Sequence, residues 1–116
     1  MESSPKEVLI YVSSAGKSPF EDWLVHLKDI QGRAKVRTRL RRLEAGNYGQ
    51  HRQLGQGIFE LKIDFGPGYR VYCGEDGPRL VLLLCGGDKG SQHADVLKAR
   101  NLWADYLGRR QSHGKA

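Results

Sequence analysis

Residues 58–73 read Ile-Phe-Glu-Leu-Lys-Ile-Asp-Phe-Gly-Pro-Gly-Tyr-Arg-Val-Tyr-Cys, and this stretch decides the fold. Hydrophobic and polar residues alternate over 58–64 and again over 69–73, which is the pattern of strands with one buried face. The loop between them is rich in glycine and proline, which turn the chain. The stretch therefore predicts an antiparallel β-hairpin whose turn is centred on Gly66.

The polar face of this hairpin carries the first candidate site. With the turn at Gly66, Lys62 lies opposite Arg70, and Glu60 lies opposite Tyr72. Two cations opposite each other destabilise a sheet by up to about 1 kcal/mol, so such a pair on an open face suggests a bound anion, such as a phosphodiester. The alternative is that these residues are only the solvated side of a half-exposed sheet. A register shifted by one residue would instead place Arg70 in the core.

The flanking segments complete the domain. Ser18 and Glu21 form a capping box ahead of one helix, Gly46 suits the end of a second helix, and the apolar run 80–85 indicates an interior strand. The predicted elements are a strand at 7–12, helices at 19–30 and 33–45, strands at 58–64, 69–73 and 80–85, and a helix from Ser91 to about Leu107.

This order, β-α-α-β-β-β-α, predicts a single α+β domain over residues 1–116. We expect a twisted, largely antiparallel sheet with a helical hairpin on one face, and a second face that is partly open and rimmed by the last helix. Residues 46–57 are expected to be a polar connection and residues 86–90 a sharp loop. The ordered core should span about 5–108, followed by a frayed basic tail at 109–116.

Composition narrows the class of protein. A chain of 116 residues can build a core without disulfides or metal. Cys73 and Cys85 lack metal-ligand spacing, so we expect two buried free thiols and neither a metal nor a cofactor. No apolar run approaches the roughly 20 residues of a membrane span, and the N-terminus does not resemble a signal peptide, which favours a cytoplasmic address. The net charge of +6 suggests a polyanionic partner, although solubility alone would also explain it.

Four further residues outside the hairpin are candidates for the site, Lys89 for catalysis and Arg37, Arg41 and His93 for binding RNA. Lys89 follows the interior strand in a glycine-flanked loop, where functional side chains often lie. Arg37 and Arg41 belong to the basic second helix, which could follow a phosphate backbone without sequence preference. His93 lies near the start of the last helix. The alternative for Lys89 is a plain turn before a helix. For Arg37 and Arg41 it is a solvated helix face, and for His93 it is a surface histidine with no role in the site.

The residue types on this face suit metal-independent cleavage of RNA by its own 2′-hydroxyl. The reaction needs a base for the 2′ proton, cations for the phosphorane and an acid for the 5′ oxygen, and base and acid contribute roughly 10²–10⁴-fold each. Glu60, Lys62, Arg70, Tyr72 and Lys89 contain suitable groups. Glu60 is a candidate base, with a cation of lowered pKa as the alternative. Arg70 matches the geometry of a phosphate.

Four segments together resemble one known family. The sequence is similar, over about residues 5–107, to the HigB-like, phage-related addiction module killer proteins of the RelE/ParE toxin superfamily. The segments are Ser18-Pro-Phe-Glu-Asp-Trp-Leu, Arg39-Leu-Arg-Arg-Leu-Glu-Ala-Gly-Asn, Phe59-Glu-Leu-Lys-Ile-Asp-Phe-Gly-Pro-Gly-Tyr-Arg-Val-Tyr and Leu82-Leu-Leu-Cys-Gly-Gly-Asp-Lys.

This resemblance implies a RelE-like fold, ribosome-associated cleavage of messenger RNA, and a cognate helix-turn-helix antitoxin that forms a hetero-oligomer with the toxin. The superfamily's sheet arginine matches Arg70, a strand lysine matches Lys62, and the basic residue after the last strand matches Lys89. Glu60 occupies the position of a second strand lysine, and only Tyr106 is a loose match for a C-terminal tyrosine.

Two other functions remain open at this point. The same fold serves the ParE branch, whose members bind DNA gyrase without cutting RNA, and fold alone does not separate the two activities. The chain could also be a decayed toxin or an accessory DNA-binding partner. The polar sheet face with Lys62, Arg70 and Tyr72 favours the nuclease.

Overall fold

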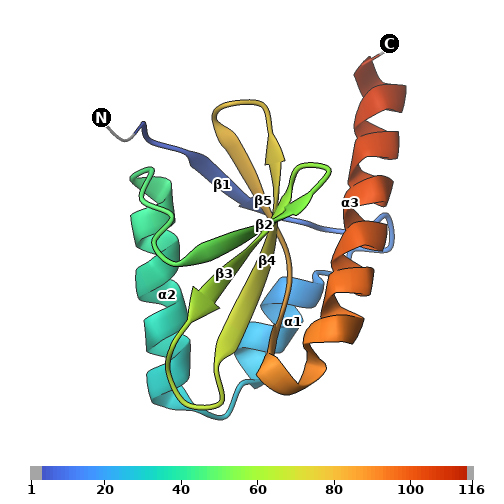
Figure 1. The fold of residues 1–116 in the computed structure, drawn as a ribbon. Coiled ribbons are helices and arrows are strands. Elements are labelled where there is room, and N and C mark those ends of the chain that lie inside the picture. Colours follow the sequence, from blue (N-terminus) through green and yellow to red (C-terminus); the bar gives the residue numbers. More distant parts are fainter. Residues whose placement is uncertain (1–3, 115–116) are drawn as a thin grey trace.

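A computed structural model describes residues 4–114, with side chains described up to Arg110. Its helices and strands form three layers, because the first two helices pack on one face of the sheet and the C-terminal helix packs on the other. Figure 1 shows the C-terminal helix, in orange and red, across the sheet from the second helix, in teal. The elements are β1 (Glu7–Ile10), α1 (Pro19–His26), α2 (Ile30–Glu44), β2 (His51–Gly55), β3 (Ile58–Ile63), β4 (Tyr69–Asp76), β5 (Leu80–Asp88), a 3₁₀ turn η1 (Lys89–Ser91) and α3 (Gln92–Gly114).

The sheet has the strand order β1-β5-β4-β3-β2. Only β1 and β5 pair in parallel, and the three other pairs are antiparallel. The predicted α+β class, the largely antiparallel sheet and the C-terminal helix are therefore confirmed. The run beginning at Leu80 is an interior strand as expected, since β5 lies between β1 and β4.

The expectation that residues 46–57 form only a polar connection was wrong, because residues 51–55 form the edge strand β2. This strand pairs with β3, with His51 opposite Leu61 and Arg52 opposite Glu60. Its side chains are mostly exposed, so the hydrophobic alternation that marks a half-buried strand is missing. An edge strand hydrogen-bonds through its backbone to a single neighbour, and its side chains can stay exposed, so it forms here without a hydrophobic alternation.

The sharp loop expected at 86–90 was also placed too early. Gly86 and Gly87 continue β5, opposite Val71 and Arg70 of β4. A Cβ on Gly86 would lie 2.3 Å from the ring of Trp23 in α1, and one on Gly87 would lie 1.9 Å from the Asp95 carboxylate in α3. The two glycines thus allow a helix to approach the strand from each face, and they do not mark a turn.

Helix boundaries differ from the expected ones for identifiable reasons. Ser18 caps α1 as predicted, its hydroxyl accepting from the amide of Glu21. The α1 helix ends at His26, and α2 begins at Ile30 because Asp29 caps it by accepting from the amide of Gly32 at 2.9 Å. The helix α3 continues past Gly108 to Gly114, so residues 109–114 of the expected frayed tail are helical. Residues 115–116 lie outside the described part of the chain.

Each face of the sheet buries its own hydrophobic cluster. Phe59, Leu61 and Ile63 pack with residues of α1 and α2. On the other face the buried residues of the sheet pack against Ala99 and Trp103 of α3. Cys73 and Cys85 are both buried free thiols, as expected, and burial raises the pKa of Cys85 to about 12.

Four of the five tyrosines donate a hydrogen bond to a carboxylate. Tyr69 reaches Asp29 at 2.7 Å, and Tyr106 reaches Asp76 at 2.6 Å. Burial, together with the carboxylate, raises the pKa of each of these two phenols to about 12. Most of these bonds join the sheet to a neighbouring helix or loop. Tyr72 is the fifth tyrosine and has no such partner.

Glycine substitutions test the packing of α3. We expect Gly74→Ala to destabilise the fold by about 1–3 kcal/mol, because the added Cβ would lie 2.3 Å from the Trp103 ring. Gly108→Ala is the matched control within α3, where nothing lies within 4 Å of the added atom. This change should stabilise the protein by about 0.5–1 kcal/mol. Urea unfolding measures both, and a neutral Gly74→Ala would contradict the close packing.

Candidate active site on the α3 face of the sheet

The predicted register of the β3–β4 hairpin is confirmed. Lys62 lies opposite Arg70, and Glu60 lies opposite Tyr72. The expectation that all four side chains occupy an open face was wrong for Glu60 and Tyr72, which are both 0% exposed. Glu60 and Tyr72 are buried because side chains of β2 and α3 cover the middle of this face. The end of the face at Lys62 and Arg70 stays partly exposed.

The Glu60 cluster consists of Glu60 and the three side chains around its carboxylate. Arg52 Nη2 donates to Oε2 at 3.1 Å, and Gln92 Nε2 lies 3.0 Å from Oε2 and 3.2 Å from Oε1. Arg70 Nε lies 3.6 Å from Oε1 and forms an ion pair. A buried carboxylate needs such partners, since an unpaired one is strongly destabilising. The cluster therefore joins β2, β3, β4 and α3 around one charge.

Tyr72 lies beside this cluster with a hydroxyl that has no hydrogen-bond partner. Burial raises the pKa of the Tyr72 phenol well above its usual value, and the negative charge of Glu60 adds to this. The phenol is therefore protonated at neutral pH. Arg70 Nε is also buried without a hydrogen bond, because its distance to Glu60 exceeds the usual hydrogen-bonding range.

Lys62 and Arg70 lie at the less covered end of this face, and Lys89 lies in the turn that follows β5; we call these three cations the cation row. Lys62 and Arg70 are partly buried, and the Arg70 side chain is 12% exposed. Lys89 is exposed and follows directly after β5. The carboxylate of Asp88 caps the turn by accepting from the amides of Gly90 and Ser91. This cap fixes Lys89 close to the β3–β4 loop, where a Cβ on Gly68 would lie 3.7 Å from the Lys89 Cβ.

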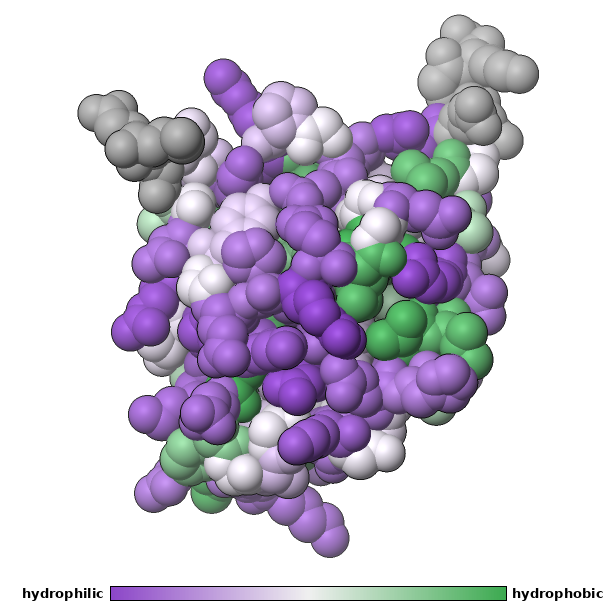
Figure 2. All heavy atoms as spheres, in the orientation of Figure 1, coloured by the Kyte–Doolittle hydropathy of each residue, from purple (hydrophilic) through white to green (hydrophobic). Residues whose placement is uncertain are grey.

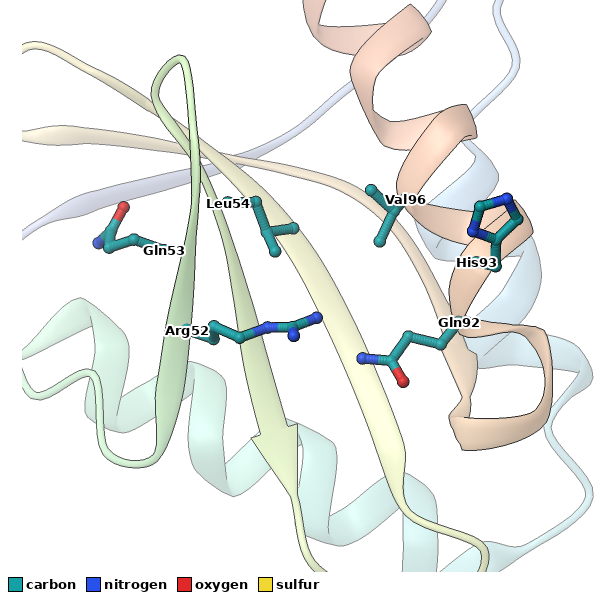
Figure 3. A pocket seen from close by; sticks show the side chains of 6 residues that line it. All are labelled: Arg52, Gln53, Leu54, Gln92, His93 and Val96. Atoms are coloured by element: carbon teal, nitrogen blue, oxygen red, sulfur yellow. The ribbon is translucent and has the colours of Figure 1, made fainter.

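A pocket of about 530 Å³ opens next to the Glu60 cluster, between β2 and α3. Arg52 and Gln92 extend toward each other from the two sides, and His93 lies on the α3 side (Figure 3). Leu54 and Val96 supply apolar walls. Figure 2 shows that this side of the molecule is largely hydrophilic, with a hydrophobic patch right of centre, toward α3. The pocket thus combines hydrogen-bonding groups with an apolar surface, as ligand pockets commonly do.

The structure brings only some of the predicted residues together. His93 lines the pocket. Arg37 and Arg41 are exposed on α2, which packs on the opposite face of the sheet, so they are not part of this site. Arg52 and Gln92 were missed, because Arg52 belongs to the unpredicted strand β2 and Gln92 is a single polar residue at a helix start. The cluster of polar residues His51-Arg52-Gln53 was a weak signal for this part of the site.

The described part of the chain, residues 4–114, contains no group of three histidine, cysteine or acidic residues that could hold a metal ion. Every helix within these residues is also too short or too polar to span a membrane. The site contains cations, amides, one imidazole and the buried carboxylate of Glu60 beside the Tyr72 phenol. Cations and amides bind anions, and an imidazole can transfer protons.

The fold and the site define a basic α+β protein whose five-stranded mixed sheet presents cations beside a buried carboxylate. No family model matches the sequence. The chain is 47% identical over 89 residues to an uncharacterized protein of Haemophilus influenzae (strain Rd), which covers 77% of this chain and 89% of the relative. The two proteins therefore belong to the same family.

Proposed function

We propose that this protein is the toxin of a type II toxin–antitoxin system, a HigB-like member of the RelE/ParE superfamily that cleaves messenger RNA without a metal ion. The observation that carries the proposal is the register of β3 and β4. It sets Lys62 directly opposite Arg70, with Lys89 fixed at the adjoining end of β5. Three cations on one open end of a sheet suit a phosphodiester.

In this proposal the cation row holds the scissile phosphate. Arg70 presents a planar guanidinium that matches two phosphate oxygens, while Lys62 and Lys89 act as point charges. Charge builds up on the phosphorane, and cations that are already in position stabilise it without reorganisation. Glu60 then acts as a positioning residue, because its buried carboxylate orients Arg70 and has no surface that could contact RNA.

In this proposal a side chain that lines the pocket transfers the protons. His93 lines the pocket next to the Glu60 cluster, and imidazole is the group most often used for proton transfer. The 2′ hydroxyl gives its proton to a base as its oxygen bonds to phosphorus, and the 5′ oxygen receives a proton as the P–O5′ bond breaks, which leaves a 2′,3′-cyclic phosphate and a 5′ hydroxyl. Tyr72 stays behind the cluster as a protonated phenol, and we assign it no contact with RNA.

The proposal includes the partners of such a toxin. A helix-turn-helix antitoxin would bind the toxin in a hetero-oligomer and cover its basic surface, and the working site would be the translating ribosome in the cytoplasm. The net charge of +6 fits association with polyanionic ribosomal RNA and mRNA. Because electrostatic steering depends on salt, we expect binding to ribosomes to weaken as ionic strength rises.

Mapping of RNA 5′ ends shortly after a pulse of expression tests the proposal. New ends within translated reading frames, appearing before growth stops, are the expected result. A parallel assay measures DNA supercoiling by purified gyrase with the purified protein. Growth arrest with no new RNA ends and with inhibited gyrase would replace the nuclease by a ParE-like activity. No arrest from a folded protein would remove the toxin assignment altogether.

A further inference from the structure

A second pocket lies on the opposite face of the sheet from the cation row. It has a volume of about 250 Å³ and lies between α2 and the end of β3. We call it the rear pocket, and its lining consists of Lys35, Thr38, Arg39, Arg42, Ile63, Asp64 and Phe65. Ile63 belongs to the hydrophobic cluster under α1 and α2, which confirms that this pocket is on the α2 side.

Three cations converge on the rear pocket from one side of α2. Lys35, Arg39 and Arg42 follow one another at spacings of four and three residues, which places their side chains together on the helix. None of the three forms an ion pair with a carboxylate among the described residues. Asp64 is the single acidic residue of the lining. The pocket therefore carries an excess of positive charge.

Arg39 is held rigidly at the back of the rear pocket. Its guanidinium donates to the carbonyl oxygens of Tyr48 and Gln50, each at 2.8 Å, and to that of Lys62. Three of its five N–H groups are thereby used, and two remain. Carbonyl oxygens orient a guanidinium but do not neutralise it. The pKa of Arg39 is lowered, first by burial and second by the charge of Arg42, as expected for crowded cations.

Thr38 adds a hydroxyl donor at the same place. Its oxygen accepts from Arg41 Nη2 at 3.3 Å, so its own hydrogen is free to be donated. Lys35 Nζ lies 5.5 Å from the centre of the Phe65 ring, which keeps the ammonium over the pocket. Like charges at these helical spacings destabilise a helix, and an anion bound between them would offset that cost.

We infer that the rear pocket binds a phosphate group through Lys35, Thr38, Arg39 and Arg42. A guanidinium held in place, further cations and a hydroxyl are groups that recognise phosphate oxygens. The phosphate is either that of a small phosphorylated molecule or a diester of an RNA backbone. The inference does not depend on the proposed nuclease activity, because no residue of the cation row lines this pocket.

Titration of isotope-labelled protein with inorganic phosphate, followed by NMR, tests the site. We expect saturable shifts centred on residues 35–42 and 63–65. Lys35→Ala/Arg42→Ala should weaken phosphate binding at least tenfold. The control Arg37→Ala/Arg79→Ala removes the same charge at exposed residues outside the pocket, and it should change binding less than twofold. An equal loss in both variants would reveal a nonspecific charge effect and overturn the inference.

A second probe distinguishes the two sources of phosphate. A short 2′-O-methyl RNA without terminal phosphates cannot be cleaved through its 2′ position and contains only diesters. If it shifts the same residues more strongly than inorganic phosphate does, the pocket recognises a nucleic-acid backbone. If inorganic phosphate binds and this RNA does not, the ligand is a small phosphorylated molecule. If neither inorganic phosphate nor this RNA produces saturable shifts, the inference is overturned, whatever the RNA mapping shows.

Discussion

The variant Arg70→Ala is expected to lose RNA cleavage by about 10²–10³-fold while keeping the fold. Arg70 lies in the middle of the cation row and is held by Glu60, so its guanidinium is already oriented when the phosphate arrives. Removing a preorganised charge affects the transition state more than it affects RNA binding. Single-turnover cleavage of a model mRNA by purified protein, with ribosomes added, measures the loss.

Two control variants make this result specific. Arg79→Ala removes one exposed cation from the β4–β5 turn and should cleave within about twofold of wild type, because Arg79 lies far along the sheet from Arg70. Arg70→Lys keeps the charge but loses the planar donor pair, so we expect intermediate activity. Full activity of a folded Arg70→Ala protein would show that the cation row is not the active site.

The variant Glu60→Ala is expected to lower the free energy of unfolding by about 3 kcal/mol. Its carboxylate is 0% exposed and is the common partner of Arg52, Arg70 and Gln92. Without it, the partly buried guanidinium of Arg70 has no counter-charge, and the amide of Gln92 loses its acceptor. Urea unfolding followed by circular dichroism measures the change.

Arg52→Ala is the matched control for the Glu60 cluster. The Arg52 side chain is 50% exposed, and Glu60 keeps Gln92 and Arg70 as partners in the variant, so the loss of Arg52 should cost about 1 kcal/mol, less than the loss of Glu60. Cleavage by Glu60→Gln separates positioning from structure, because this variant keeps the shape and loses the charge. We expect it to fold and to cleave more slowly. If Glu60→Ala were as stable as wild type, the cluster would not hold the strands together.

Local patterns in the sequence determined the hairpin and its polar face. Alternation over 58–64 and 69–73 set the pairing of Lys62 with Arg70, because a shift of one residue would have moved hydrophobic side chains to the other face. The Ser18 cap and the apolar run of β5 were equally local signals. Each of these features depends on residues that are near one another in the chain, which explains why they could be predicted.

Only the tertiary structure decided which polar residues are accessible. Glu60 and Tyr72 are buried because β2 and α3 cover them, although β2 carried no hydrophobic alternation by which to recognise it. Gly86 and Gly87 resemble a loop in sequence, but they are needed where helices approach β5 from both faces. These outcomes depend on contacts between distant segments.

The same distinction applies to the basic helix α2. The sequence established that it is basic, but not which of its cations act together. Packing of α2 against the sheet directs Lys35, Arg39 and Arg42 into the rear pocket and leaves Arg37 and Arg41 outside it. Composition and spacing therefore determined the charge and the hairpin of this protein. The sheet and its two covering layers decided where that charge is concentrated, because only packing fixes the direction of each helix face.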